Sequence, residues 1–130
     1  MIPCFAVLFF GCLFSREQEC GFKSLVPSEA QKALMNDSTI VILDVRTEEE
    51  YTSETGHLEN SKLIPIHELY SRISELDSLK GKQFLIYCRS GGRSANACSL
   101  LATKGFKVWN MDGGIIRWKK EGFPLIRSEK

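Results

Sequence analysis

The sequence is poor in the residues and spacings that form metal sites. It holds only two histidines, and none of its five cysteines is spaced as Cys-x-x-Cys. Zinc sites need clustered Cys and His ligands at short spacings, so we expect no metal site. The cysteines are also odd in number and irregularly spaced, which argues against a disulfide framework. They are Cys4, Cys12, Cys20, Cys88 and Cys98.

An excess of charge of either sign is also missing. The 130 residues contain 17 Lys and Arg against 16 Asp and Glu, which gives a net charge of +1 at pH 7. Nucleic-acid-binding domains show a basic excess, so we expect no nucleic-acid partner. An anionic small substrate would have to be held by local charges, because the whole molecule supplies no attractive field. The length fits one domain, for which a monomer is the default expectation.

Charge is absent altogether from the segment MIPCFAVLFFGCLF, and the first charged side chain is Arg16. This segment is too short to span a bilayer comfortably but matches the apolar core of a signal peptide, although no basic residue precedes it. The run from Phe9 to Cys12 loosely resembles the motif at which bacterial lipoproteins carry lipid. We therefore expect residues 1–21 to be a signal peptide or lipoprotein-type segment with a linker.

That segment predicts a periplasmic or cell-envelope location, with a membrane anchor if Cys12 carries lipid. The alternative is a buried N-terminal strand or helix, which would leave the protein cytoplasmic. Cys20 lies in the linker and could be a free thiol, an oxidation partner or a residue without a role.

From residue 22 onward, short apolar runs alternate with amphipathic segments. This alternation predicts an α/β domain over residues 22–127, with a parallel sheet covered by helices on both faces. In such folds ligands bind beyond the carboxyl ends of the strands. We expect strands at 22–26, 39–45, 62–66, 83–88 and 107–111, and helices at 27–36, 46–51, 67–79, 93–104 and 113–122.

Three helix starts carry capping signals. Ser28 with Gln31, and Thr47 with Glu50, fit the capping-box spacing, and Ser94 is a plausible N-cap for the helix after Cys88. Gly105 is placed to end that helix.

The stretch YCRSGGRSANA places Cys88 between an apolar strand and a helix start. Gly91 and Gly92 allow a sharp turn, and such a turn aims backbone N–H groups at one point and favours anions. Arg89 and Arg93 add positive charge nearby, so the pKa of the Cys88 thiol should be lowered and the thiolate should act as a nucleophile. The alternative is an ordinary strand-to-helix turn that happens to hold a buried cysteine.

The length of the turn separates two kinds of cysteine chemistry. Four residues lie between Cys88 and Arg93, whereas cysteine phosphatases have five between cysteine and arginine. The shorter ring of N–H groups suits a single sulfur atom better than a phosphate group.

Four segments, at 42–51, 56–66, 85–97 and 105–125, resemble the single-domain rhodanese family in sequence and in order. The resemblance implies a three-layer rhodanese-like α/β domain with a five-stranded parallel sheet and no metal or other cofactor. It implies sulfur transfer through a persulfide on Cys88. The implied active loop runs from Cys88 through Arg89, Ser90, Gly91 and Gly92 to Arg93. Ser94 follows this loop.

The sequence departs from the family pattern at one place. Residues 52–55 separate Tyr51 from the Gly56–His57 pair, where the family usually has a shorter segment. His57 is therefore expected to hydrogen-bond backbone in a turn rather than to act in the reaction. The family match also places Asp44 and Arg46 beside the loop, where we expect them to support the site structurally.

The resulting functional expectation is a thiosulfate sulfurtransferase. The Cys88 thiolate would attack the outer sulfur of a small anionic donor such as thiosulfate, and cyanide or a thiol would then accept the sulfur. Arg89 and Arg93 would attract the donor. Two alternatives are a sulfur-carrier or interaction module without rapid thiosulfate turnover and, with less support, a phosphatase or arsenate reductase on the same fold.

The remaining residues of interest fit structural roles. Cys98 lies on the apolar side of its helix and is expected to be a buried core thiol rather than a resolving cysteine. Trp109 and Trp118 are expected to pack in the core, and His67 is expected at the surface.

Overall fold

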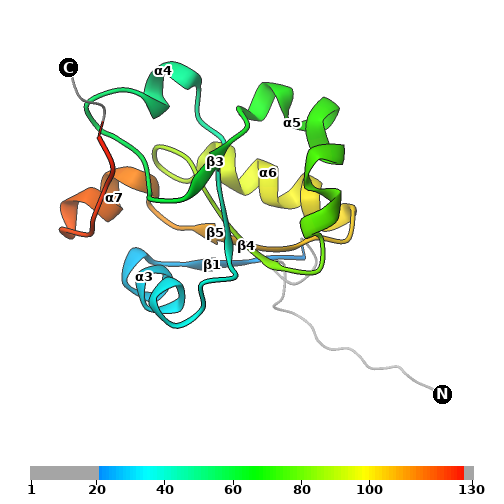
Figure 1. Cartoon of the computed structure of the whole chain (residues 1–130), viewed down its shortest axis with the longest axis horizontal. Helices are drawn as coiled ribbons and strands as arrows, with labels where there is room; N and C mark the ends of the chain where they lie inside the picture. Colours follow the sequence, from blue (N-terminus) through cyan, green and yellow to red (C-terminus); the bar gives the residue numbers. More distant parts are fainter. Residues whose placement is uncertain (1–20, 128–130) are drawn as a thin grey trace.

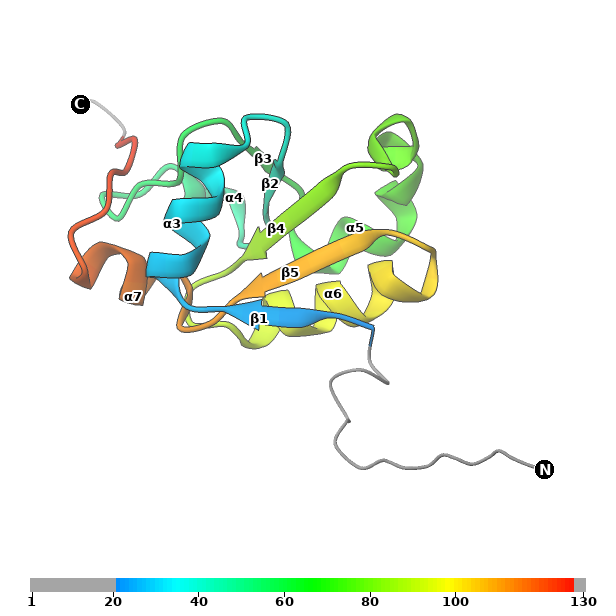
Figure 2. The same cartoon turned by 90° about the horizontal axis from the view of Figure 1, so that it is seen from below.

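A five-stranded parallel sheet forms the centre of the protein, in a computed structural model that describes residues 21–127. Its strand order is β1-β5-β4-β2-β3, and every neighbouring pair is parallel. The arrowheads of β1, β4 and β5 all point toward the end at which α7 lies (Figure 2). The expected α/β fold is confirmed. The strands are β1 (Lys23–Leu25), β2 (Val41–Asp44), β3 (Ser61–Leu63), β4 (Gln83–Tyr87) and β5 (Lys107–Met111).

Helices cover both faces of this sheet, with α5 and α6 on one side and α3 on the other (Figure 1). They are α3 (Pro27–Asn36), α4 (Glu48–Tyr51), α5 (Ile66–Arg72), the 3-10 helix η1 (Ile73–Leu79), α6 (Gly92–Thr103) and α7 (Gly114–Lys120). Within residues 21–127, none of these helices has the length and apolar character needed to cross a membrane. The expectations for the signal segment, for lipid on Cys12 and for Cys20 lie outside the described residues.

Alternating side chains along the strands feed two separate apolar cores. Phe84 and Ile86 of β4 face α5 and α6, whereas Leu85 and Tyr87 face α3 and α7. Cys88 belongs to the same core as Phe84 and Ile86, so its side chain lies on the α6 side of the sheet. Trp118 is 2% exposed in the second core, and Trp109 packs against it, as expected.

The capping prediction was right for α4 and wrong for α3. At α4, the Glu50 amide donates to Thr47 Oγ1 at 3.2 Å and the Thr47 amide donates to Glu50 Oε1 at 3.0 Å. At α3, the helix already begins at Pro27, one residue before the predicted cap Ser28. Proline is favoured at the first helical position because its fixed φ suits the helix. The N–H that proline lacks would have no partner within the helix at that position.

The structure also differs from the prediction at the strand expected over 62–66 and at the helix expected over 67–79. Residues 62–66 do not form one strand, because the chain turns at Pro65 and Ile66 begins α5. The single helix expected over 67–79 is α5 followed by η1, although Leu69 and Leu76 are fully buried on the expected stripe. The apolar spacing therefore identified the buried face but not the change of helix type.

Candidate active site

Cys88 lies directly after β4, the central strand of the sheet, and is 1% exposed. Its backbone is held on both sides. The amide of Val45, just after β2, donates to Tyr87 O at 3.1 Å, and the amide of Ile115 in α7 donates to Cys88 O at 2.9 Å. The cysteine is therefore fixed at the carboxyl edge of the sheet, where the sequence placed it.

Three hydrogen-bond donors converge on the Cys88 sulfur. The Gly91 amide lies 3.1 Å from Sγ, and the amide and hydroxyl of Ser94 each lie 3.4 Å from it. Two of these donors are backbone N–H groups at the start of α6, where helix amides have no carbonyl partner within the helix. The loop closes around the sulfur as the turn chemistry predicted.

These donors decide the ionisation of the thiol. Burial is the largest single influence on Cys88 and opposes its charged form, but the Ser94 hydroxyl and the amides of Ser94, Gly91 and Ser90 together outweigh it. The pKa of Cys88 is therefore lowered from its ordinary value. Hydrogen bonds to a charged group favour that group, and a thiolate is the reactive form of cysteine.

The backbone of the loop differs from expectation at two residues. Gly91, with φ of 113°, is the residue that caps α6, and Ser94 lies inside the helix, fully buried. Ser94 was therefore wrong as an N-cap, because its hydroxyl is used on Cys88 Sγ and Gly91 O. Gly92 has no positive φ and open space at its Cα, so only Gly91 uses glycine's conformational freedom.

A second glycine turn, before α7, packs directly on this loop. A Cβ on Gly114 would clash with Arg89 O, and the Ile116 amide donates to the same carbonyl at 3.2 Å. Asn110 at the end of β5 donates from Nδ2 to Gly91 O at 3.4 Å. The sequence analysis did not single out Gly114 or Asn110, because only the fold brings them to Cys88.

Arg93 has a carboxylate partner that the sequence analysis also missed. Its Nη1 and Nη2 lie 2.8 and 2.9 Å from the two carboxylate oxygens of Glu50 in α4. This hydrogen-bonded arginine lowers the pKa of Glu50 to about 2. Since Glu50 had been read only as a capping residue, nothing local indicated the pair, whose members are 43 residues apart. Arg93 thus ties the loop to α4, and Arg89 is exposed.

Asp44 and Arg46 form a buried pair beneath the site. Arg46 Nη2 lies 2.7 Å from Asp44 Oδ2 and 2.8 Å from Gly56 O, and the two side chains are 2% and 0% exposed. This pair links the end of β2 to the segment that follows α4. His57 stacks on Tyr51 with 3.8 Å between ring centroids, and its Nδ1 lies 3.1 Å from Tyr51 O. Both arrangements match the structural roles expected for these residues.

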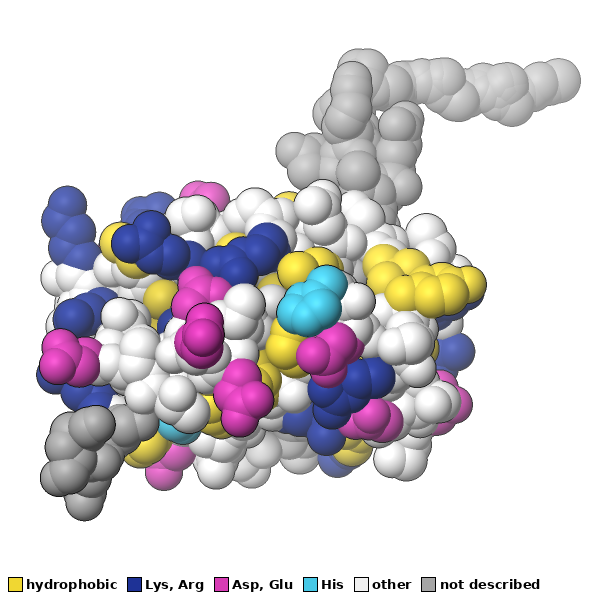
Figure 3. Space-filling view, turned by 90° about the horizontal axis from the view of Figure 1, so that it is seen from above, with side chains coloured by type: hydrophobic (Ala, Val, Ile, Leu, Met, Phe, Trp, Pro, Cys, Tyr) yellow, Lys and Arg dark blue, Asp and Glu magenta, His cyan; other side chains and the backbone are white. Residues whose placement is uncertain are grey.

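A cavity of about 470 Å³ opens beside the loop. One wall is α7, and the other is α4 with the segment after it. Lys and Arg side chains gather at this end of the molecule, on the left of Figure 3, where α7 lies in Figure 1. Among residues 21–127, no group of three or more Cys, His, Asp or Glu could hold a metal ion. The cavity is lined by Arg46, Glu50, Ser53, Thr55, Arg89, Ile115, Ile116, Lys119 and Lys120.

The structure thus shows an α/β protein with a five-stranded parallel sheet and a buried cysteine whose sulfur accepts hydrogen bonds at the start of a helix. Comparison with known proteins gives the family. The model of the rhodanese-like domain matches residues 26–121, and the chain belongs to that family.

Relatives and solved structures agree with this assignment. A protein of Allochromatium vinosum named sulfurtransferase is 35% identical over 97 residues, which are 74% of this chain and 87% of the relative. A rhodanese-related protein of Thermoplasma volcanium superposes with a TM-score of 0.72 at 30% identity, covering 80% of this chain and 97% of that one. A thiosulfate sulfurtransferase of Pseudomonas aeruginosa gives a TM-score of 0.71 at 28% identity, covering 88% of this chain and 22% of that one.

Proposed function

We propose that this protein is a sulfurtransferase that carries sulfane sulfur as a persulfide on Cys88 and accepts it from a donor such as thiosulfate. The observation that carries the proposal is the convergence of the Gly91 amide and both Ser94 donors on Sγ. Membership of the rhodanese-like family and the resemblance to a thiosulfate sulfurtransferase structure support it.

The first step loads the sulfur. The Cys88 thiolate attacks the outer sulfur of thiosulfate, a new S–S bond forms, the original S–S bond breaks and sulfite leaves with the bonding pair. The product is an anionic persulfide. The amides at the start of α6 point at Sγ, the atom to which the charged outer sulfur is bonded, so they are fixed donors next to this anion.

The second step removes the sulfur. A nucleophile such as cyanide or a thiol attacks the outer sulfur of the persulfide, and the Cys88 thiolate is the leaving group. The lowered pKa of Cys88 makes this thiolate a good leaving group as well as an available nucleophile. Neither step needs a general base, because the thiolate is already available. The scheme is a two-step, ping-pong transfer.

The test is to incubate the protein with thiosulfate, measure its intact mass, then add cyanide and measure thiocyanate. We expect one added sulfur atom on the wild type, removed by cyanide, and no added sulfur on Cys88→Ser. Sulfur that is added only in the presence of a partner protein would favour a carrier module over a thiosulfate-using enzyme. Hydrolysis of an aryl phosphate that depends on Cys88 would instead favour the phosphatase alternative.

A further inference from the structure

One polar side chain beside the Cys88 loop is buried with an atom left unpaired. Asn110, near the end of β5, is 5% exposed, and among residues 21–127 its Oδ1 has no hydrogen-bond partner. Burying an unpaired polar atom costs free energy, and such atoms are rare in folded proteins. An apolar side chain of the same shape would avoid this cost. Stability therefore does not explain an asparagine at this position.

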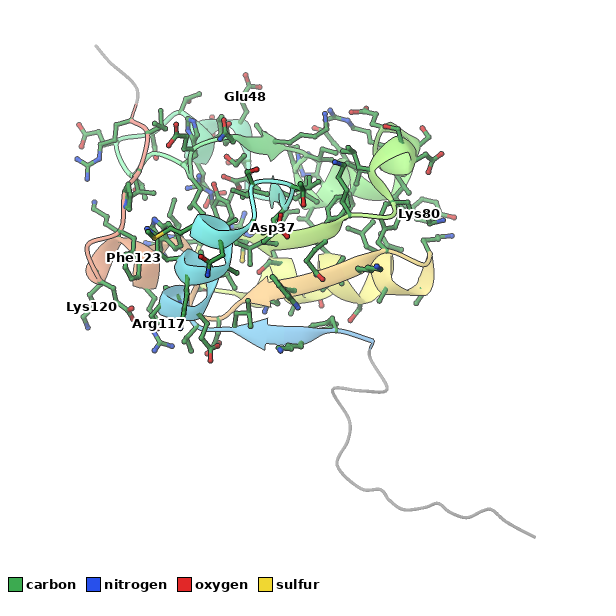
Figure 4. The ribbon with its side chains drawn as sticks, turned by 60° about the horizontal axis from the view of Figure 1, so that its bottom comes forward. Asp37, Glu48, Lys80, Arg117, Lys120 and Phe123 are labelled. Atoms are coloured by element: carbon green, nitrogen blue, oxygen red, sulfur yellow. The ribbon has the colours of Figure 1, made fainter. Side chains whose placement is uncertain are left out.

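The fold brings Asn110 to the start of α6. Val108, two residues earlier on β5, packs in the core on the α6 side of the sheet, and alternation along the strand places Asn110 on the same face. The helix α6 lies against β5, and β5 ends toward α7, on which Figure 4 labels Arg117 and Lys120. Asn110 Nδ2 lies 3.4 Å from Gly91 O, and the nitrogen is the atom that faces this oxygen because two carbonyl oxygens would repel each other.

Three donors lie within reach of the Gly91 carbonyl oxygen. The Ala95 amide donates to it at 3.1 Å, as expected for the residue that caps a helix. The Ser94 hydroxyl lies 3.2 Å from it and Asn110 Nδ2 lies 3.4 Å from it. A carbonyl oxygen has two lone pairs. The Ala95 amide and Asn110 together fill both, which leaves none for the Ser94 hydroxyl.

The Ser94 hydroxyl has one proton and two acceptors within reach. Besides Gly91 O, it lies 3.4 Å from Cys88 Sγ. A thiolate is a strong acceptor, whereas a neutral thiol sulfur is a weak one. If Gly91 O were free, the hydroxyl would donate to it while Cys88 is a thiol and would give up that bond when Cys88 ionises. With Gly91 O occupied, no such bond is given up, so the bond to the thiolate is a larger net gain.

Building on the proposed function, in which Cys88 reacts as a thiolate, we propose that Asn110 is a positioning residue that occupies Gly91 O and thereby directs the proton of the Ser94 hydroxyl to Cys88 Sγ. Asn110 acts through Ser94 and not by its own contact with the sulfur. The unpaired Oδ1 follows from a side chain that has to present Nδ2 to Gly91 O. The arrangement would serve both steps of sulfur transfer, because Cys88 is the nucleophile in the first and the leaving group in the second.

The pH dependence of Cys88 alkylation by iodoacetamide tests this role. Alkylation is followed by peptide mass analysis, so that the other cysteines do not contribute. Asn110→Leu removes Nδ2 and Oδ1 at nearly the same shape, and Asn110→Ala is the second variant if leucine disturbs the loop. Both should shift the profile toward higher pH, as expected for Ser94→Ala. Below the midpoint, they should slow alkylation by at least about half of the factor that Ser94→Ala produces.

Urea unfolding of the same variants separates this role from a structural one. The midpoint of Asn110→Leu should stay at or above that of the wild type, because Gly91 O keeps the Ala95 amide and the Ser94 hydroxyl as donors. Val108→Ala is the matched control, since it removes apolar contacts from the same strand and face but no hydrogen-bond donor. It should lower the midpoint and leave the alkylation profile unchanged.

The double variant Ser94→Ala/Asn110→Leu tests the route of the effect. If Asn110 acts through the Ser94 hydroxyl, the profile of the double variant should coincide with that of Ser94→Ala alone. Arg93 and Cys98, whose pKa values the charge of Cys88 influences, are present in every variant. A further shift in the double variant would mean that Asn110 acts by another route, and would overturn the inference.

Two other results would also overturn it. One is a profile of Asn110→Leu and of Asn110→Ala that coincides with the wild type. The other is a shift in Val108→Ala as large as that in Asn110→Leu, which would show that any change in the packing of β5 has the same effect. Sulfur loading of the wild type from thiosulfate is measured separately. Failure to load would overturn the proposed function, whereas the alkylation profiles would still decide the role of Asn110.

Discussion

Two buried cysteines, ten residues apart, show what makes a thiol reactive in this fold. Cys88 is 1% exposed and Cys98 is 0% exposed, and both belong to the same apolar core. Burial raises the pKa of Cys98 to about 12, with a smaller contribution from the charge of Cys88. The pKa of Cys88 is lowered despite its burial. Burial alone therefore does not decide which thiol ionises.

The difference between the two cysteines is their position relative to α6. Cys88 lies just before the helix, where the first amides have no carbonyl partner and can donate to a sulfur. Cys98 lies in the middle of the same helix, where each amide is used by the backbone, and the structure shows no donor to its sulfur among the described residues. The start of this helix thus favours the thiolate of Cys88, whereas its middle offers the Cys98 sulfur no such support.

The largest effect should come from removing one cysteine or the other. Cys88→Ala should abolish sulfur loading from thiosulfate, because the nucleophile is gone. Cys98→Ala should load at a rate within about twofold of the wild type, while the free energy of unfolding falls by about 1 kcal/mol from the lost core contacts. Intact mass and urea unfolding measure the two effects. Sulfur loading that persists in Cys88→Ala would refute the contrast between the cysteines.

The next largest effect should come from Gly114→Ala, which tests how the loop around Cys88 is held. Gly114 has φ of 64°, and its Cβ would meet the Arg89 carbonyl carbon and oxygen, which are backbone atoms. We expect the free energy of unfolding to fall by roughly 2–4 kcal/mol and the alkylation rate of Cys88 to change with it. Gly81→Ala is the control, since it has open space and no positive φ. Equal effects of the two variants would contradict the packing of α7 on the loop.

A smaller effect, on ionisation, is expected from Ser94→Ala. This change removes the hydroxyl donor 3.4 Å from Cys88 Sγ and keeps the Ser94 amide. The pKa of Cys88 should rise, so that below this pKa the thiolate fraction is smaller in the variant than in the wild type. The wild type should therefore keep its reactivity to a lower pH than the variant.

The rate of alkylation by iodoacetamide, measured against pH, checks this shift. Ser99→Ala removes a hydroxyl from the same helix, away from Cys88, and should leave the profile unchanged. A profile of Ser94→Ala that coincides with the wild type would show that the backbone amides alone set the ionisation of Cys88.

The smallest effect should come from Glu50→Gln, which weakens the link between the loop and α4. Because Glu50 is 28% exposed, solvent screening limits the loss to about 1 kcal/mol of unfolding free energy near neutral pH. The pKa of Glu50 is lowered to about 2, so its contribution is full above its ordinary pKa and is lost as pH falls toward 2. The difference between wild type and variant should therefore shrink in acid.

Urea unfolding between pH 7 and pH 3 measures this dependence. Glu48→Gln, at an exposed position in the same helix, is the matched control and should show no such trend. A stability difference for Glu50→Gln that is constant over this range would mean that Glu50 does not owe its contribution to its charge.

The sequence predicted the parts of this molecule that depend on local pattern. Apolar runs located four of the five strands closely and the third only in part, since β3 is Ser61–Leu63 and not 62–66. The spacing of Cys88, Gly91 and the following helix located the cradle around the sulfur. The errors came where several local solutions compete. Ser94 suited a cap, but Gly91 took that place because its positive φ turns the chain, and the Ser94 hydroxyl was then free to donate to the sulfur.

The contacts that the sequence did not reveal are long-range ones. The Arg93–Glu50 pair joins residues 43 apart, and Gly114 meets Arg89 only because β5 lies beside β4. Neither has a signature in its neighbours along the chain. Both contacts depend on the order of the strands in the sheet. The alternation of strands and helices along the sequence does not determine that order.

The contact between α7 and the Cys88 loop also has a consequence for the order in which the domain can fold. The amides of Ile115 and Ile116 hold the carbonyls of Cys88 and Arg89, and β1, from the start of the domain, pairs with β5, from near its end. During synthesis, the cysteine emerges well before the segment that braces it. A nascent chain thus carries Cys88 and the start of α6 before it carries the helix that braces them.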